Sequence, residues 1–309
     1  MTSSSPQLLI WSASDGYKGY YRLWLPSRPA LANVVCLHGI QSHSGWYDYS
    51  SARLCEAGYI VWFPDRRGSG RNWEQRGDCP SYRRLLADVA EIIASIRAGM
   101  YAARIPGRGP GVDLPVILLA GSWGAKLAVA CCRAFPGCAD ALILWSPGFF
   151  PQVRLSWRDR WRVLLARLLE PRRLFPIPLN DPNLFTANPE RIRFIEEDEL
   201  ALRQATARFL VESRRLDWYV RGAAKHVTCP VLLLLAGKDR IIDNQKTRQF
   251  FERFASSHKT VQEYPDAHHT LEFEKEPDFF LQDILDWLAQ IQPRLQRRES
   301  SFQPAWPAL

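Results

Sequence analysis

The sequence predicts an α/β protein with a mostly parallel eight-stranded sheet, flanked by helices, and a helical segment inserted between the sixth and seventh strands. Short β-rich runs alternate with longer helical stretches, which is the pattern of parallel strands joined by crossover helices. The alternation fails between about Pro147 and Val227, so we expect the insertion there, at the carboxyl edge of the sheet. With 309 residues, 47% of them hydrophobic, the chain can bury one large core and carry an insertion as well.

The expected strands are short, and several are continuous apolar runs, as in strands that helices cover on both faces. They are Gln7–Ser12, Tyr20–Pro26, Asn33–Leu37, Tyr59–Phe63, Pro115–Leu119, Ala141–Trp145, Val231–Leu235 and Thr260–Tyr264. Apolar residues at spacings of three and four predict amphipathic helices over Ser81–Met100, Gln245–Phe254 and Asp278–Ile291.

The break in the alternation also divides the chain into parts. We expect residues 1–147 and 227–292 to form the core domain and residues 148–226 to form a helical cap. Residues 293–309, which begin with a proline and contain several arginines and serines, are expected to be a loosely ordered tail.

The composition excludes several classes of protein. The longest apolar runs fall far short of the roughly 18 to 20 residues that a bilayer-spanning helix needs, and the first residues lack the regions of a secretory signal. Seven cysteines, an odd number without a CxxC pair, favour free thiols in a reducing cytoplasm. The net charge of +8 comes from 33 Arg and 7 Lys spread along the chain, which indicates a solvated surface and no nucleic-acid site.

The strongest local signal is a serine between small residues. The apolar run 116–119 leads into Ala-Gly-Ser-Trp-Gly at 120–124 and then into a helix, which is the pattern of a nucleophile elbow. Small residues are needed two positions before and after the serine because the strand turns abruptly into the helix. Gly124 meets this need, and Ala120 adds only one methyl to the usual glycine. Ser122 is therefore the candidate nucleophile.

A carboxylate and a base are required for the chemistry of this serine. The base takes the serine proton, and the carboxylate orients the base and stabilises its cationic form. Behind an elbow of this kind, the acid and then the histidine follow on loops after later strands. Asp239, in the turn that ends the strand Val231–Leu235, is the candidate acid. Asp243 is the rival, although it more naturally caps the next helix.

The candidate base lies in the pair His268-His269. His226 precedes the acid and His258 precedes the last strand, so their positions exclude both. Adjacent residues cannot both face the serine, and the order along the chain leaves the choice within the pair open. A metal site at this pair would need further ligands at suitable spacing, which the sequence does not offer. The chemistry itself requires neither a metal nor an organic cofactor.

Two backbone amides are expected to form an oxyanion hole, which acyl transfer needs for the charge that develops on the substrate. One is the amide of Trp123, directly after the nucleophile. The other is the amide of Ile40, in the loop after the third strand, where His38-Gly39 lets the backbone turn. We interpret His38 itself as structural.

These pieces together resemble the α/β-hydrolase superfamily, and in detail its monoacylglycerol lipase and lysophospholipase-like branch. Residues 38–47, His-Gly-Ile-Gln-Ser-His-Ser-Gly-Trp-Tyr, are similar to the extended His-Gly loop of that branch. Residues 64–70, Pro-Asp-Arg-Arg-Gly-Ser-Gly, are similar to its Asp-x-x-Gly-x-Gly turn. The likeness covers roughly residues 15 to 290.

The resemblance also selects a histidine. The branch carries its catalytic histidine in a Gly-Ala-x-His-x-Leu stretch with a Glu a few residues later. Ala267, His269, Leu271 and Glu274 fit this stretch, and Asp266 stands where the family has Gly. The resemblance therefore implies that His269 is the base.

As to function, the resemblance implies an α/β-hydrolase fold and a carboxylic-ester hydrolase acting on monoacylglycerol, lysophospholipid or a similar small acyl ester. Thioesterase, amidase and acyltransferase activities use the same residues, and the sequence does not separate them. A non-catalytic scaffold is disfavoured because every expected position is filled. An oxidoreductase is disfavoured because the glycines at 107, 109 and 111 precede a strand, whereas a phosphate-binding loop follows one.

One stretch of the expected cap is amphipathic. Trp157, Trp161, Leu164, Leu165 and Leu168 lie at helical spacing. The arginines around them are Arg154, Arg158, Arg160, Arg162, Arg167, Arg172 and Arg173. Such a stripe can rest on an anionic lipid surface, which would be a peripheral partner, or it can pack on the domain below. The sequence leaves both interpretations open.

Overall fold

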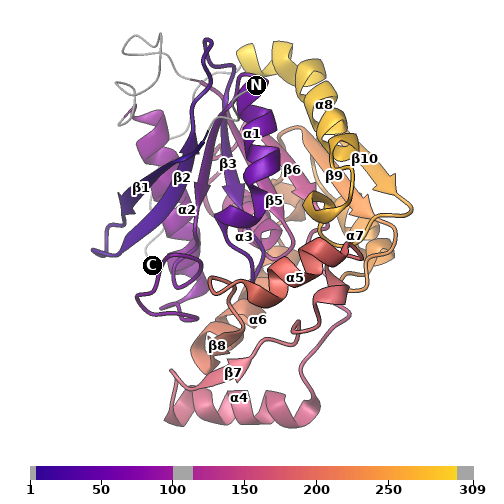
Figure 1. Cartoon of the computed structure of the whole chain (residues 1–309). Coiled ribbons are helices and arrows are strands. Elements are labelled where there is room, and N and C mark those ends of the chain that lie inside the picture. Colours follow the sequence, from indigo (N-terminus) through magenta and orange to yellow (C-terminus); the bar gives the residue numbers. More distant parts are fainter. Residues whose placement is uncertain (1–4, 100–113, 298–309) are drawn as a thin grey trace.

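The computed structural model describes residues 5–99 and 114–297, and an eight-stranded sheet forms its centre (Figure 1). The strand order is β1-β2-β4-β3-β5-β6-β9-β10, antiparallel from β1 to β4 and parallel from there on. The strands are β1 (Gln7–Ser12), β2 (Lys18–Trp24), β3 (Asn33–Leu37), β4 (Ile60–Pro64), β5 (Val116–Gly121), β6 (Ala141–Trp145), β9 (Val231–Ala236) and β10 (Lys259–Tyr264). The predicted fold class is confirmed; β1, β3 and β6 have the expected ends, and the other strand ends differ by at most two residues.

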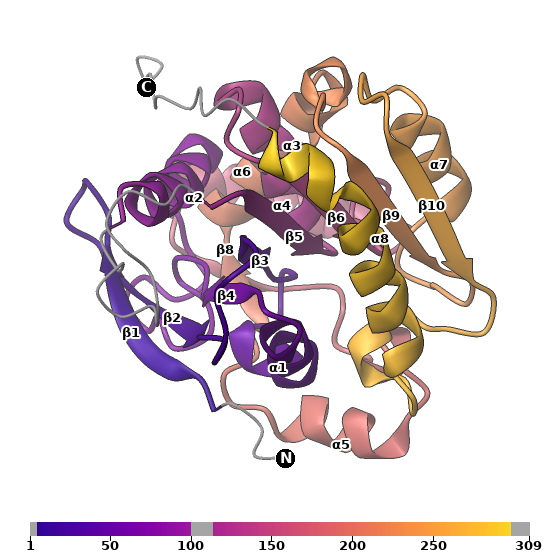
Figure 2. The same cartoon turned by 90° about the horizontal axis from the view of Figure 1, so that it is seen from above.

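Helices cover the sheet on both faces (Figure 2). Side chains alternate along β3, so Val34 and Cys36 join one apolar core and Val35 and Leu37 join the other. The first core includes α1 (Asp48–Glu56) and α8 (Asp278–Gln296), and the second includes α2 (Tyr82–Arg97), α3 (Gly124–Ala134) and α7 (Asn244–Phe251). Because both faces are covered, every residue of β3 to β6 and β9 is buried, as the continuous apolar runs indicated.

The three expected helices differ from the structure at their ends, and α7, expected to end at Phe254, ends at Phe251. Helix α2 starts after Ser81, whose hydroxyl accepts a hydrogen bond from the Arg84 amide, and it ends at Arg97, before the expected end at Met100, which itself lies outside the described residues. Helix α8 continues past its expected end at Ile291 to Gln296, with Pro293 inside it. Ile291 and Leu295 are both buried against the same core, so packing compensates the hydrogen bond that the proline removes. The expectation of a loose tail from Pro293 was therefore wrong for 293–296, and residues 298–309 lie outside the described part.

The insertion between β6 and β9 confirms the predicted helical segment between the sixth and seventh strands of the main sheet. It holds α4 (Trp157–Leu169), α5 (Pro189–Glu197) and α6 (Ala207–Arg221). It also holds a two-stranded antiparallel sheet that the sequence did not predict, formed by β7 (Leu174–Pro176) and β8 (Gln204–Thr206). In Figure 1 the insertion lies below the sheet, and α4 is its outermost element. We propose residues 148–226 as the bounds of this cap.

Three further findings concern the part of the chain that the structure describes. All seven cysteines are free thiols, and six of them are buried. Within residues 5–99 and 114–297, none of the helices combines the length and the apolar character that crossing a bilayer requires. Short 3-10 helices complete the chain at Ser44–Tyr47, Pro182–Leu184, Ala224–His226 and Leu271–Phe273.

Candidate active site

Ser122 lies at the sharp turn between β5 and α3, at the edge of the sheet that faces the cap. Its φ of +50° belongs to the left-handed region, which non-glycine residues rarely adopt. Two backbone hydrogen bonds hold this conformation: the Ser122 amide donates to the Trp145 carbonyl at 3.1 Å, and the Gly148 amide donates to the Ser122 carbonyl at 2.7 Å. Backbone strain of this kind concentrates at functional sites, where surrounding contacts maintain it.

The small residues around the serine are required by close packing. A Cβ on Gly121 would lie 1.6 Å from Nε1 of Trp145, and a Cβ on Gly124 would lie 2.3 Å from the Leu37 carbonyl oxygen. Neither position can therefore carry a side chain without moving the backbone or the indole. Ala120 is fully buried within the core, so its methyl group is accommodated where a glycine was expected.

His269 joins Ser122 to Asp239. Its Nε2 lies 2.9 Å from Oγ of Ser122, and its Nδ1 lies 2.7 Å from Oδ2 of Asp239. Oδ1 of the same carboxylate accepts the amides of Ile241 at 2.8 Å and Ile242 at 3.0 Å. Since an ionised carboxylate only accepts, Nδ1 of the imidazole donates to it, and Nε2 is left to accept the serine hydroxyl proton. The His269 and Asp239 side chains are almost completely buried.

The two rival residues face elsewhere. Oε1 of Glu274 accepts the His268 amide at 2.6 Å and lies 3.0 Å from Nδ1 of the His268 ring, which directs that ring away from Ser122. This contact also fixes the loop that carries His269. Asp243 caps α7 by accepting the Lys246 amide at 3.0 Å. The structure thus brings together Ser122, His269 and Asp239, and it places His268 and Asp243 outside that set.

Two amides border the serine. A Cβ on Gly39 would lie 3.6 Å from Oγ of Ser122, so the loop that carries Ile40 runs directly against the serine. The Trp123 nitrogen directly follows Ser122, and a Cβ on Gly148 would lie 3.1 Å from it. Neither the Ile40 nor the Trp123 amide donates to another group within the part of the chain that the structure describes. Both amides are therefore free to donate to a substrate oxygen.

The cap contributes side chains that the sequence did not identify. Nε1 of Trp123 donates to Oγ of Ser213 in α6 at 2.8 Å, and the Trp123 ring stacks on Phe209 with centroids 5.5 Å apart. Phe185 contacts the His269 ring edge-on, with centroids 6.0 Å apart. These residues follow Ser122 by more than sixty positions and carry no local motif, so only the packing of the cap reveals them. Among the described residues there is no group of His, Cys, Asp and Glu able to hold a metal.

The fold and this site together define a serine hydrolase of the α/β-hydrolase fold: a serine at a strained turn, a histidine bridging it to a buried carboxylate, and two unused amides. Residues 28–276 match the model of the Hydrolase_4 family, described as serine aminopeptidase, S33. The chain belongs to this family.

Several known proteins similar to this chain are named as lipases. A monoacylglycerol lipase of Mycolicibacterium smegmatis is 27% identical over 93% of this chain and 99% of its own length. The human monoglyceride lipase is 25% identical over 90% of this chain and 88% of its own. The crystal structure of a monoacylglycerol lipase from Paleococcus ferrophilus has a TM-score of 0.75 at 22% identity, covering 89% of this chain and 99% of that one. A soluble variant of the Saccharomyces cerevisiae monoglyceride lipase, crystallised with a substrate analog, has a TM-score of 0.80 at 17% identity, covering 94% and 96%.

Proposed function

We propose that this protein hydrolyses carboxylic esters of monoacylglycerol, lysophospholipid or a similar acyl ester, with Ser122, His269 and Asp239 as its catalytic triad. The observation that carries this proposal is the pair of contacts on one imidazole, 2.9 Å to the serine and 2.7 Å to the carboxylate. This arrangement satisfies what a hydroxyl needs to become a nucleophile near neutral pH.

The reaction follows from these contacts. Oγ of Ser122 attacks the ester carbonyl carbon while Nε2 of His269 takes the hydroxyl proton, and the amides of Ile40 and Trp123 stabilise the resulting oxyanion. The carbon-oxygen bond to the alcohol then breaks, and His269 gives its proton to the departing alcohol. Water attacks the acyl-enzyme by the same route, which releases the acid and restores Ser122. Asp239 stabilises the imidazolium in both halves.

The substrate class is supported by the names of the similar lipases and by the apolar surroundings of the site. Phe185 packs edge-on against the His269 ring, so an apolar side chain lies directly beside the proposed base, which suits an acyl chain better than a charged or strongly polar group. A thioesterase, an amidase or an acyltransferase would use the same triad. The family description names an aminopeptidase, so an aminoacyl amide belongs in the substrate panel.

A substrate panel with matched variants tests this proposal. We expect hydrolysis of monoacylglycerol, lysophosphatidylcholine and p-nitrophenyl esters of increasing chain length. Thioesters and aminoacyl amides should be hydrolysed only slowly, and little acyl group should be transferred to added glycerol. Ser122→Ala and His269→Ala should each lose about 10⁴-fold or more in kcat, whereas His268→Ala should remain near the wild type. Turnover by Ser122→Ala at the wild-type rate would contradict the mechanism, and a faster amide than ester reaction would contradict the substrate class.

We also propose that α4 rests on an anionic lipid surface. The apolar stripe expected there is exposed: Trp161 is 68% exposed and Leu168 is 80% exposed. Trp157, Leu164, Leu165 and Leu169 share this exposure. Arginines at 158, 160, 162, 172 and 173 are exposed beside them, which complements negative headgroups. Only Val163 and Ala166 are buried in this helix, which favours a lipid surface over packing of the stripe on the domain below.

Vesicle binding tests whether α4 contacts the lipid, as opposed to any exposed apolar residues of the protein. We expect the protein to sediment with vesicles of phosphatidylcholine containing phosphatidylglycerol, more weakly with phosphatidylcholine alone, and less as salt is added. Replacing Leu168 and Leu169 together by Ser should weaken binding about 100-fold or more, because each leucine contributes about 1.5–3 kcal/mol when buried in lipid. The control replaces Leu8 and Ile10, which are exposed on the edge strand β1, by Ser. Equal losses in both variants would exclude α4 as the contact.

For the location in the cell, we propose the cytoplasm. The support is that all seven cysteines are free thiols, a state that reducing compartments maintain. Cell fractionation with the native protein tests this directly.

A further inference from the structure

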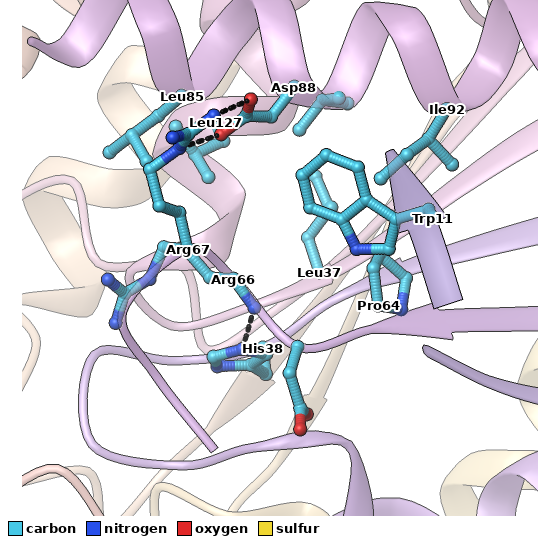
Figure 3. A pocket seen from close by; sticks show the side chains of 12 residues that line it. Trp11, Leu37, His38, Pro64, Arg66, Arg67, Leu85, Asp88, Ile92 and Leu127 are labelled. Carbon is cyan, nitrogen blue, oxygen red and sulfur yellow. Dashed lines mark hydrogen bonds and ion pairs between the residues drawn. The ribbon is translucent and has the colours of Figure 1, made fainter. Parts of the chain in front are cut away.

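His38 is a buried histidine with a defined partner at each ring nitrogen. It belongs to the same loop as Ile40, and only 2% of the residue is exposed. Nε2 lies 2.9 Å from the backbone nitrogen of Arg66, and Nδ1 lies 2.8 Å from the carbonyl oxygen of Gly39. Figure 3 shows the first of these bonds, beside a small cavity that Leu37 and Trp11 also line.

These partners determine the tautomer of the ring. A backbone N–H only donates, so Nε2 of His38 accepts from Arg66 and carries no proton. A carbonyl oxygen only accepts, so Nδ1 carries the proton and donates to Gly39. Burial, together with the nearby Arg66 guanidinium, lowers the pKa of His38 to about 3, so the ring is neutral throughout the physiological range.

The acceptor on Gly39 belongs to the peptide whose other end is the Ile40 amide. In a trans peptide the C=O and N–H groups point in opposite directions. A hydrogen bond that holds the Gly39 carbonyl toward His38 therefore holds the Ile40 N–H on the opposite side of the peptide plane. A Cβ on Gly39 would lie 3.4 Å from Cβ of Ser122, so this peptide is next to the nucleophile.

Arg66 restrains the next peptide of the same loop. Its Nη2 donates to the Ile40 carbonyl at 2.9 Å, and its guanidinium lies 4.9 Å from the centroid of the Trp123 ring. The Phe209 ring lies at 4.9 Å as well, so the cation is enclosed between two aromatic side chains. Both peptides that flank Ile40 thus have a fixed carbonyl, one held by His38 and the other by Arg66.

We propose that His38 is a positioning residue: as the neutral Nδ1–H tautomer it fixes the orientation in which the Ile40 amide meets the substrate oxyanion. This inference deepens the proposed function and rests on it. Amide donors contribute most to catalysis when they are already oriented and need no reorganisation during the reaction. Without the Nδ1–H donor, the Gly39-Ile40 peptide can rotate, and the amide loses part of its interaction with the oxyanion.

Two substitutions separate this role from simple packing. The side-chain NH2 of His38→Asn can reach the Gly39 carbonyl in place of Nδ1, whereas the side-chain oxygen of His38→Gln can accept the Arg66 amide in place of Nε2. Each variant keeps one hydrogen bond and loses the other, so similar losses of stability are expected. Only His38→Gln loses the bond that orients the Ile40 amide.

We expect His38→Gln to lower kcat about 10- to 100-fold with KM nearly unchanged, which is less than the roughly 10²–10³-fold cost of removing an oxyanion-hole donor outright. His38→Asn should stay within about 5-fold of the wild type. A trifluoromethyl ketone, which forms a tetrahedral oxyanion adduct with the serine, should bind more weakly to His38→Gln by the same factor as kcat/KM falls. Equal loss of kcat in both variants, or a loss carried by KM, would overturn the proposal.

The tautomer of His38 can also be measured in the wild-type protein, so this test does not depend on whether a variant folds. With ¹⁵N-labelled histidine, NMR chemical shifts distinguish a protonated from an unprotonated ring nitrogen. We expect Nδ1 of His38 protonated, Nε2 unprotonated and no titration between pH 5 and 8; the other tautomer or a titrating ring would overturn the proposal. If instead wild type and Ser122→Ala hydrolyse esters equally, the proposed function fails while the tautomer result stands, so the two failures are distinguishable.

Discussion

The helices α4 and α6 belong to the same insertion and pack against each other, yet their environments are opposite. Both are amphipathic and rich in arginine. In α6, Phe209 and Leu216 are completely buried against the core domain, whereas the tryptophans and leucines of α4 face outward. An apolar stripe in the sequence therefore indicates a surface that favours burial, but it does not indicate against what that surface is buried. The stripe of α6 is buried against the domain carrying Ser122, and for α4 we propose a lipid surface.

The polar contacts of the two helices differ in the same way. From α6, Asp217 lies 2.6 Å from Nζ of Lys126 in α3, and Glu212 accepts the Tyr82 amide at 3.0 Å. From α4, the ion pair of Arg162 with Asp159 stays within the helix itself. Helix α6 is therefore bound to the core by groups on α2 and α3, and it carries the Ser213 hydroxyl that fixes the Trp123 indole.

The largest difference between these helices should appear when one aromatic residue is removed from each. Phe209→Ala removes a completely buried ring that stacks on Trp123, so we expect the free energy of unfolding to fall by about 3–5 kcal/mol. Trp161→Ala, at an exposed position of α4, should change it by no more than about 0.5 kcal/mol. Urea unfolding of both variants measures this. Similar losses would mean that α4 is buried against a partner in solution.

An intermediate effect is expected from the ion pairs. Lys126→Met leaves the half-buried Asp217 carboxylate with Arg214, at 3.5 Å, as its one remaining cation among the described residues, which should cost about 1–3 kcal/mol of unfolding free energy. The matched change in α4, Arg162→Met, breaks an exposed pair that is worth about 0–1 kcal/mol. Chemical denaturation at low and high salt checks both values. A loss at Arg162 as large as that at Lys126 would contradict the comparison.

Much of the site could be predicted because its residues sit in local patterns. A nucleophile elbow, a turn after an apolar strand and a histidine after the last strand are each readable from neighbours in sequence. Parallel strands then bring their carboxyl ends to one edge, so order along the chain becomes proximity in space. This is why Ser122, Asp239 and His269 could be selected together. The choice of His269 over His268 needed the resemblance to a family, since both follow the same strand.

The remainder depends on packing between distant segments. The strands β7 and β8 have three residues each, too short to show any periodicity. Helix α8 continues past Pro293 because Leu295 is buried in the core. In the sequence, the proline indicated the end of the helix, and the burial of Leu295 could not be seen. The role of His38 depends on which groups its ring nitrogens meet, Arg66 on one side and Gly39 on the other. A His-Gly pair in the sequence predicts the turn but not that geometry.

The smallest expected effects concern the caps at the start of each helix. Oγ1 of Thr206 accepts the Phe209 amide at 3.0 Å and donates to the buried Asp78 at 2.7 Å, whereas Oγ of Ser156 accepts the Asp159 amide at 3.1 Å in an exposed position. Thr206→Ala should therefore lower the unfolding free energy by about 1–2 kcal/mol and Ser156→Ala by about 0.5 kcal/mol. Thermal unfolding of the two variants measures both losses of unfolding free energy. If Ser156→Ala proves the more damaging, the start of α4 is held more firmly than its exposure indicates, and the contrast between the helices fails at that end.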